Sequence, residues 1–332
     1  MSNQGTPIID LHIDSFIWTR LLGYDIFKRH GLGPLRGNFL GQVDLPRLKD
    51  AGITGAMWSI TTNPFRTKSG RARAFRQNFT RFVNLIRKNP DELKLIGSYS
   101  DLDPSKLGNR HAVWLSVQGG NALDHDLKEI SEYAPYLTRI TLMHLTHSRL
   151  GTSSTPYPSF KKRGLTKLGR DFVESLNRHR IFVDLAHADP QTFQDVVSIH
   201  DKSIPFLVTH TGVKEIHEHW RNISDEQIKW VAQTGGVIGV LYHSRYLGPS
   251  RNDDKNESIL LHLEHIHKIA GEDFTALGSD WDGMIVPDQN LRDCGRFPEL
   301  IQHMEKRGWS VTKIEKTLGF NFLRAFKNLR PN

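Results

Sequence analysis

Short apolar segments recur along the whole chain and alternate with longer segments in which apolar and polar residues mix. Each apolar segment has the length of a strand and is rich in Val, Ile, Leu or Phe, which is the pattern of a strand buried on both faces. The pattern predicts eight strands, at residues 8–12, 54–60, 112–117, 139–144, 181–187, 206–210, 237–242 and 275–280.

Most of the intervening segments carry apolar residues at helical spacing. They predict amphipathic helices at residues 73–88, 166–179, 190–200, 225–233 and 257–270, and a last helix at 311–329. Strands separated by helices pair in parallel through right-handed crossovers. Because no glycine-rich phosphate fingerprint follows the first strand, we expect an α/β fold of the closed (β/α)8 TIM-barrel type. Residues 1–332 are expected to form one barrel domain with a C-terminal helical extension.

Several of the predicted strands end in residue types that bind metal ions. The first strand ends in a His-x-Asp tripeptide, whose imidazole and carboxylate point to the same side of the strand. The full set is His12, Asp14, His144, His187, His210 and Asp280. Taken alone, one such histidine suits a hydrogen-bonded rim residue, and Asp280 suits a turn or a helix cap. Together, on separate strands of one barrel, they favour a metal site.

This set suits metal-assisted hydrolysis. His12 and Asp14 can hold one ion, and His187 and His210 a second, with a bridging carboxylate between them. Asp280 can orient the attacking water and carry its proton to the leaving group.

Composition narrows the function further. The net charge of +8 invites a nucleic-acid interpretation, but the Lys and Arg residues are spread along the chain without interleaved aromatics. We therefore expect a solvated basic surface and no nucleic-acid partner. Cys294 is the single cysteine, which excludes an intramolecular disulfide and a thiolate zinc cluster. No apolar run approaches the ~20 residues of a membrane helix, and no basic-then-apolar leader is present, so a cytoplasmic protein without a membrane partner is predicted.

Nearly the whole chain resembles the membrane dipeptidase (renal dipeptidase, peptidase M19) family of zinc peptidases, within the amidohydrolase-like metal-dependent hydrolases. The motifs that carry the resemblance are IIDLHID, LSVQGG, ITLMH, LVTHTG, RNISDEQI, GSDWDG and LGFNFLRAF. It implies a zinc-dependent dipeptidase that uses metal-activated water to cleave a peptide bond in a small, dipeptide-like substrate with a free carboxylate. It also implies one or two Zn²⁺ ions and a homodimer.

The resemblance assigns a role to each matching position. His12 and Asp14 would bind one zinc, and His187 and His210 the other. His144 would contact substrate and help to polarise the scissile carbonyl, with His147 as the alternative if the register differs. Arg221 would bind the terminal carboxylate of the dipeptide, and Asp280 would serve as the acid/base. These positions are His12, Asp14, His144, His187, His210, Arg221 and Asp280.

One position departs from the family pattern. The family has a glutamate that bridges both zincs, and this chain has Gln118 there. An amide oxygen can coordinate a metal, but it brings no negative charge to offset the repulsion between two cations. Three outcomes stay open: a single-metal hydrolase, a dinuclear enzyme with altered ligation, or a catalytically altered or inactive barrel with a binding or biosynthetic role. The other site positions are intact, which favours an active metal enzyme.

Overall fold

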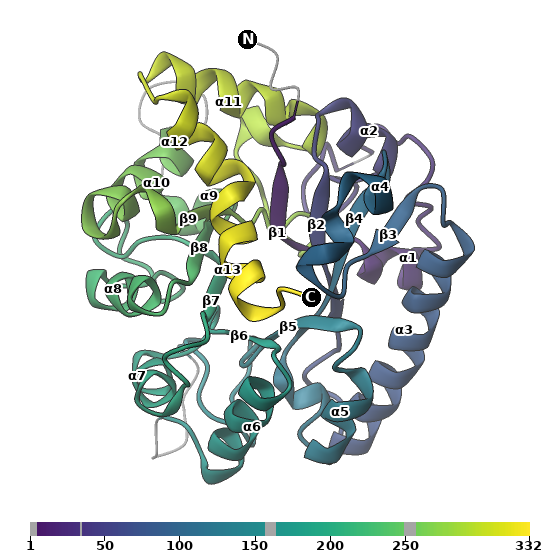
Figure 1. Ribbon diagram of the computed structural model, residues 1–332, viewed down its shortest axis with the longest axis vertical. Helices are drawn as coiled ribbons and strands as arrows, with labels where there is room; N and C mark the ends of the chain where they lie inside the picture. Colours follow the sequence, from purple (N-terminus) through teal and green to yellow (C-terminus); the bar gives the residue numbers. More distant parts are fainter. Residues whose placement is uncertain (1–4, 34, 157–163, 249–256) are drawn as a thin grey trace. The chain divides into compact units, whose positions relative to one another are not determined.

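The computed structural model describes residues 5–33, 35–156, 164–248 and 257–332 (Figure 1). Its strands are β1 (Ile9–Ile13), β2 (Gly55–Thr61), β3 (Leu93–Leu95), β4 (His111–Gln118), β5 (Leu137–Thr141), β6 (Phe182–Asp184), β7 (Leu207–Thr211), β8 (Val237–Val240) and β9 (Thr275–Leu277). They are hydrogen-bonded in the order β2-β1-β9-β8-β7-β6-β5-β4-β3, and β2 also pairs with β4. A pairing order that returns on itself is that of a closed barrel, so the predicted fold class is confirmed.

All eight predicted strands are present, and β3 is an additional short strand. Four of the predicted strands were extended too far, among them β8, which ends at Val240 and not at residue 242. β5, β6 and β9 each end three residues before the expected ligand, at Thr141, Asp184 and Leu277. The expected ligands in these segments therefore lie in the loops that follow the strands.

The predicted helices are also present. The helices are α1 (Phe16–Leu22), α2 (Leu45–Asp50), α3 (Lys68–Lys88), α4 (Pro104–Leu107), α5 (Ile130–Tyr133), α6 (Lys167–Arg178), α7 (Pro190–Ile199), α8 (Asp225–Gln233), α9 (Ser244–Leu247), α10 (Glu257–Ala270), α11 (Phe297–Lys306), α12 (Val311–Glu315) and α13 (Asn321–Leu329). The C-terminal helical segment is interrupted by a π-helical turn at Lys316–Phe320. None of the described helices is long and apolar enough to cross a membrane.

The chain divides into two compact units that interleave along the sequence. Unit 1 comprises Met1–Trp58, Thr209–Lys229 and Val237–Arg324, and unit 2 comprises Ser59–Val208, Trp230–Gly236 and Ala325–Asn332. The expected site residues are therefore shared between them. Unit 1 holds His12, Asp14, His210, Arg221 and Asp280, and unit 2 holds Gln118, His144 and His187. The single-domain organisation inferred from the sequence stays a prediction.

Close packing in unit 1 brings three strands together near one of the predicted ligands. A methyl group on Gly278 would lie 1.7 Å from the backbone oxygen of Thr209, and one on Gly239 would lie 2.1 Å from the same atom. Only glycine fits at these two positions. Helix α10 lies against β8 and β9 (Figure 1), and its buried face includes Leu260, Leu263 and Ile266.

The core of unit 2 contains a buried ion pair. Arg139 on β5 and Asp184 on β6 are both fully buried, and Nη1 of Arg139 donates to Oδ2 of Asp184 at 2.9 Å. The other guanidinium nitrogen, Nη2, donates to the hydroxyls of Ser59 and Ser116, each at 2.9 Å. These hydrogen bonds offset the free-energy cost of removing the two charges from water. An unpaired buried charge would lack this compensation.

Candidate metal centre

In unit 1, His12 and Asp14 lie at the end of β1, where the backbone of the segment after β9 holds them in place. The Asp10 carboxylate accepts hydrogen bonds from the backbone N–H groups of His12 and Ser279, both at 2.9 Å. The N–H of Asp280 donates to the carbonyl of His12 at 3.1 Å, and the N–H of Asp14 donates to the carbonyl of Trp281 at 3.0 Å. These bonds keep the ends of β1 and β9 side by side and so bring His12 and Asp280 together.

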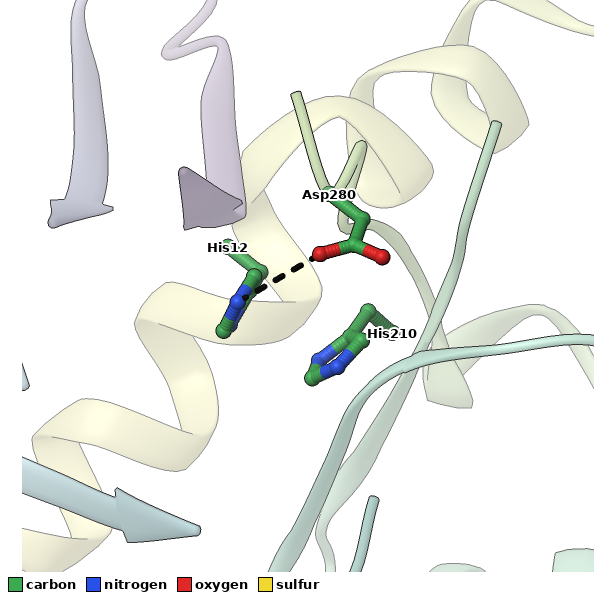
Figure 2. Close-up of side chains that lie close together, drawn as sticks. All are labelled: His12, His210 and Asp280. Carbon is green, nitrogen blue, oxygen red and sulfur yellow. Dashed lines mark ion pairs between the residues drawn. The ribbon is translucent and has the colours of Figure 1, made fainter. Parts of the chain in front are cut away.

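Three side chains of unit 1 lie around the His12 imidazole, those of Asp14, His210 and Asp280. Nε2 of His12 lies 3.3 Å from Oδ2 of Asp14 and 3.6 Å from Oδ1 of Asp280. The ring of His210 stacks on the ring of His12, with centroids 3.9 Å apart. Figure 2 shows His12, His210 and Asp280 facing one another, and one ligand atom from each lies within 4.8 Å of the others. We refer to His12, Asp14, His210 and Asp280 as the unit 1 cluster.

The unit 1 cluster has the chemistry of a metal site. It offers two imidazoles and two carboxylates, which are donors that divalent transition metals prefer. All four residues are at most 8% exposed, so the charges of the two carboxylates are poorly screened by solvent. A bound divalent cation would balance them. The donor set therefore fits one ion at the end of the first strand. His210 lies in this cluster with His12, whereas the sequence interpretation paired it with His187 around a second ion.

The surroundings of His210 orient it and link it to Arg221. The Thr209 hydroxyl lies 2.9 Å from Nδ1 of His210, a contact that helps to fix the orientation of the imidazole ring. Arg221 is 4% exposed, and its Nη2 donates to the carbonyl of His210 at 2.9 Å. The carbonyl of Arg221 accepts from the Thr211 hydroxyl at 3.1 Å. The guanidinium of Arg221 is thus held beside His210 on β7.

Unit 2 brings Gln118, His144 and His187 together. Gln118 is the last residue of β4, and its Oε1 accepts from the Thr61 hydroxyl at 3.0 Å. Its Nε2 lies 3.5 Å from Nε2 of His187. The rings of His144 and His187 meet edge to face, with centroids 5.0 Å apart. His147, the alternative to His144, instead uses Nδ1 to accept from the backbone N–H of Ser153 at 3.1 Å.

One expected ligand, His187, and the expected acid/base, Asp280, have left-handed backbones. His187 has φ of 66° and Asp280 has φ of 64°, a region that non-glycine residues adopt at a cost of roughly 1–3 kcal/mol. Such strain gathers at functional sites. The glycine after Gln118 also matters, because Gly119 has φ of 96° and a methyl group on it would lie 3.3 Å from Cβ of His144. The Gln-Gly-Gly run thus permits the approach of the β4 end to His144.

The strand-end pattern missed residues that neighbour the unit 1 cluster. Tyr246 on α9 stacks on His219, with ring centroids 4.5 Å apart, and both follow strands by several residues. Burial raises the pKa of the Tyr246 hydroxyl; the charge of Arg221 opposes this shift, and the charge of Asp280 adds to it. Burial also raises the pKa of the Cys294 thiol, which agrees with the expectation of an incidental cysteine.

Comparison with known proteins shows a match over nearly the whole chain. The family model "Membrane dipeptidase (Peptidase family M19)" matches residues 3–331. Among solved structures, a probable dipeptidase, PvdM, from Pseudomonas aeruginosa has a TM-score of 0.86 at 19% identity, covering 99% of this chain and 96% of that chain. The metallopeptidase "dipeptidase AC" of family M19 has a TM-score of 0.84 at 21% identity, covering 98% and 99%.

A third solved structure carries a ligand. It is a metallopeptidase from Rhodobacter sphaeroides bound to a phosphinate mimic of the dipeptide L-Ala-D-Ala, with a TM-score of 0.82 at 21% identity, covering 97% of this chain and 99% of that chain. At these identities, the structural likeness shows the fold alone.

Proposed function

The chain belongs to the membrane dipeptidase family, peptidase family M19, and we propose that it hydrolyses the peptide bond of a small dipeptide-like substrate with a free carboxylate. The observation that carries the proposal is the unit 1 cluster, in which two buried imidazoles and two carboxylates converge. The dipeptide mimic bound to the Rhodobacter sphaeroides relative supports this class of substrate.

We propose Zn²⁺ as the metal, held by His12, Asp14 and His210. Imidazole and carboxylate donors suit zinc, and three protein ligands leave a coordination position open. When bound, the ion supplies Lewis-acid activation of water and of the scissile carbonyl. A second ion that uses His187 stays a proposal from the family resemblance. In unit 2, the Gln118 oxygen is engaged by Thr61, which argues against Gln118 as a strong ligand.

The remaining residues have separate proposed tasks. Asp280 takes a proton from the attacking water and delivers it to the departing amine. Arg221 binds the terminal carboxylate of the substrate, because a guanidinium pairs with a carboxylate through two parallel hydrogen bonds. His144 donates to the oxygen of the scissile carbonyl. The homodimer and the cytoplasmic location also remain proposals.

The test combines elemental analysis with an assay of dipeptide hydrolysis. The wild-type protein, dialysed against buffered Zn²⁺, is expected to hold at least one ion per chain and to hydrolyse Ala-Ala peptides of defined stereochemistry. His210→Ala should lose both properties. His303→Ala on α11 is the matched control and should keep both. A wild type without metal, or a His210→Ala variant with normal turnover, would contradict the proposal.

Gln118→Glu tests the number of ions. The variant adds a negative charge at the position where the family has its bridging glutamate. We expect the metal content per chain to rise from one ion toward two. Gln233→Glu adds the same charge at the exposed end of α8 and should leave the content unchanged. A wild type that already holds two ions would show that the amide is tolerated and that the dinuclear site persists.

A further inference from the structure

A cavity of about 510 Å³ lies within unit 1, among the segments that follow β7, β8 and β9. Its lining includes His217 after β7, Arg245 on α9 after β8, and Val286 to Gln289 after β9. The same three segments carry Arg221, Tyr246 and Asp280. The cavity therefore shares its supporting loops with the residues proposed to bind and cleave the substrate.

The cavity has a positively charged side. Arg245 is exposed, and it forms no ion pair or side-chain hydrogen bond with any residue that the structure describes. Its charge acts on two neighbouring histidines, although burial is the larger cause of the shift in both. Burial, and then the charges of His217, Arg221 and Arg245, lower the pKa of His219. Burial and a set of charges that includes Arg245 lower the pKa of His243 to about 4. Cationic groups thus outweigh anionic ones around these two rings.

One carboxylate also lines the cavity, but it has another task. Asp288 is 6% exposed, and its Oδ1 accepts from the backbone N–H of Asn290 at 2.9 Å. That bond caps the short turn Gln289–Leu291. The Asp288 carboxylate is therefore almost buried and engaged by the turn that it caps, whereas the exposed guanidinium of Arg245 has no such partner among the described residues.

Part of the cavity lining is apolar and fixed in place. Val286 and Pro287 form it, and the carbonyl of Val286 accepts from the Ser244 hydroxyl at 3.0 Å and from the backbone N–H of Ser244 at 3.0 Å. These bonds tie the segment after β9 to the start of α9. A lining that combines apolar residues with a guanidinium suits a short aliphatic side chain that ends in an anion.

We propose that this cavity binds the side chain of the carboxyl-terminal residue of the substrate, and that Arg245 makes the protein prefer dipeptides in which that residue is acidic. The inference rests on the proposed function. Arg221 would bind the main-chain carboxylate, and Arg245 would bind the side-chain carboxylate. A substrate with two carboxylates would thus engage two guanidinium groups of unit 1.

The experiment compares Ala-Asp with Ala-Asn, a pair that differs in charge and hardly in shape. Both are used as L,L and L,D isomers, so that the comparison covers either stereochemistry of the carboxyl-terminal residue. In the wild type we expect kcat/KM to be about fivefold to tenfold higher for Ala-Asp, through KM, since an exposed charge pair contributes modestly. Arg245→Gln should reduce this ratio to about one. Arg296→Gln removes an exposed guanidinium of unit 1 and should keep the wild-type ratio.

The outcomes separate this inference from the proposed function. A wild type that cleaves both peptides equally, or an Arg245→Gln variant that keeps the preference, overturns the inference while dipeptide hydrolysis stands. If neither peptide is cleaved, the same pair is titrated by calorimetry. Tighter binding of Ala-Asp that Arg245→Gln abolishes would support the cavity assignment while the proposed hydrolysis fails. Equal binding would overturn the assignment as well.

Discussion

Asp280 combines a strained backbone with the proposed acid/base carboxylate. Its φ of 64° is one that aspartate and asparagine tolerate better than most residues, because their short polar side chains can bond locally. The carboxylate lies 3.6 Å from Nε2 of His12, so its charge belongs to the unit 1 cluster. A substitution that keeps the backbone conformation of residue 280 and removes its charge can therefore separate the two contributions.

Asp280→Asn should keep the fold and lose turnover. Asparagine tolerates the left-handed backbone but cannot accept and deliver the proton, so we expect kcat to fall by about 100-fold or more. Thermal unfolding should shift by no more than it does for a surface substitution. Steady-state kinetics measures the fall in kcat, and calorimetry measures the shift in the unfolding temperature. A variant that keeps a tenth of the wild-type kcat would exclude Asp280 as the acid/base.

At the scale of elements, the close packing of β7 against β8 and β9 positions His210. Gly278→Ala would place a methyl group 1.7 Å from the Thr209 oxygen, so these strands must separate. We expect the free energy of unfolding to fall by about 3 kcal/mol or more, with weaker metal binding because His210 follows Thr209. Denaturant unfolding measures the first effect and metal titration the second. Gly31→Ala, where a methyl group meets nothing within 4 Å, is the control and should change neither.

Helix α10 contributes a pH-sensitive contact. Nδ1 of His262 accepts from the backbone N–H of Val213 at 2.7 Å, and Nε2 lies 3.1 Å from the carbonyl of Leu247. This arrangement requires the neutral ring, and burial lowers the pKa of His262 to about 4. A lowered pKa means that the unfolded chain binds the proton more readily than the folded one. The contribution of His262 to stability is thus complete above about pH 6.5 and is lost as the pH falls toward 4.

His262→Gln should reduce the acid sensitivity of the protein. Glutamine has a neutral donor and acceptor at every pH, so the stability of the wild type relative to the variant should fall by about 3 kcal/mol between pH 6.5 and pH 4. Calorimetric scans of both proteins across this range give the difference, in which other titrating groups cancel. Parallel pH profiles for the two proteins would show that His262 does not titrate in this window.

The elements were more predictable from the sequence than the site. Long buried strands and amphipathic helices have strong periodic signals, and α8 and α10 have the predicted bounds. β3 has three residues and only one is buried, so it carries no such signal. The ends of β5, β6 and β9 were missed because apolar residues continue into loops whose backbone turns left-handed at His187 and Asp280.

Within the site, the strand-end pattern identified residues but not their neighbours. His12, Asp14, His210 and Asp280 were proposed from the pattern, and the structure brings them together in unit 1. Arg245 and Tyr246 lie on a helix of four residues, which is too short for a periodic pattern. The proposed roles of these two residues depend on their neighbours in the folded structure, and the sequence pattern does not indicate which residues those neighbours are.

For the whole molecule, metal binding should contribute to folding stability. The unit 1 cluster draws its residues from β1, β7 and the loop after β9, so its charges are brought together only in the folded state. A ligand that binds only the folded state stabilises it by about 2.7 kcal/mol at 100 times its dissociation constant. We expect removal of metal by a chelator to lower the unfolding temperature, and Zn²⁺ but not Mg²⁺ to restore it. An unfolding temperature that is indifferent to chelation and to Zn²⁺ would contradict a metal site in the cluster.

The interleaving of the two units has a consequence for biosynthesis. Strand β1 is completed at Ile13, yet its partner β9 begins at Thr275, and the two pair through Asp10 and Leu277. At roughly 5–20 residues per second, β9 leaves the ribosome on the order of tens of seconds after β1. The nascent chain must therefore carry one edge of β1, with His12 and Asp14 beside it, unpaired until the residues of β9 have been synthesised. A ribosome that stalls before residue 275 would release a chain whose first-made ligands have no cluster to join.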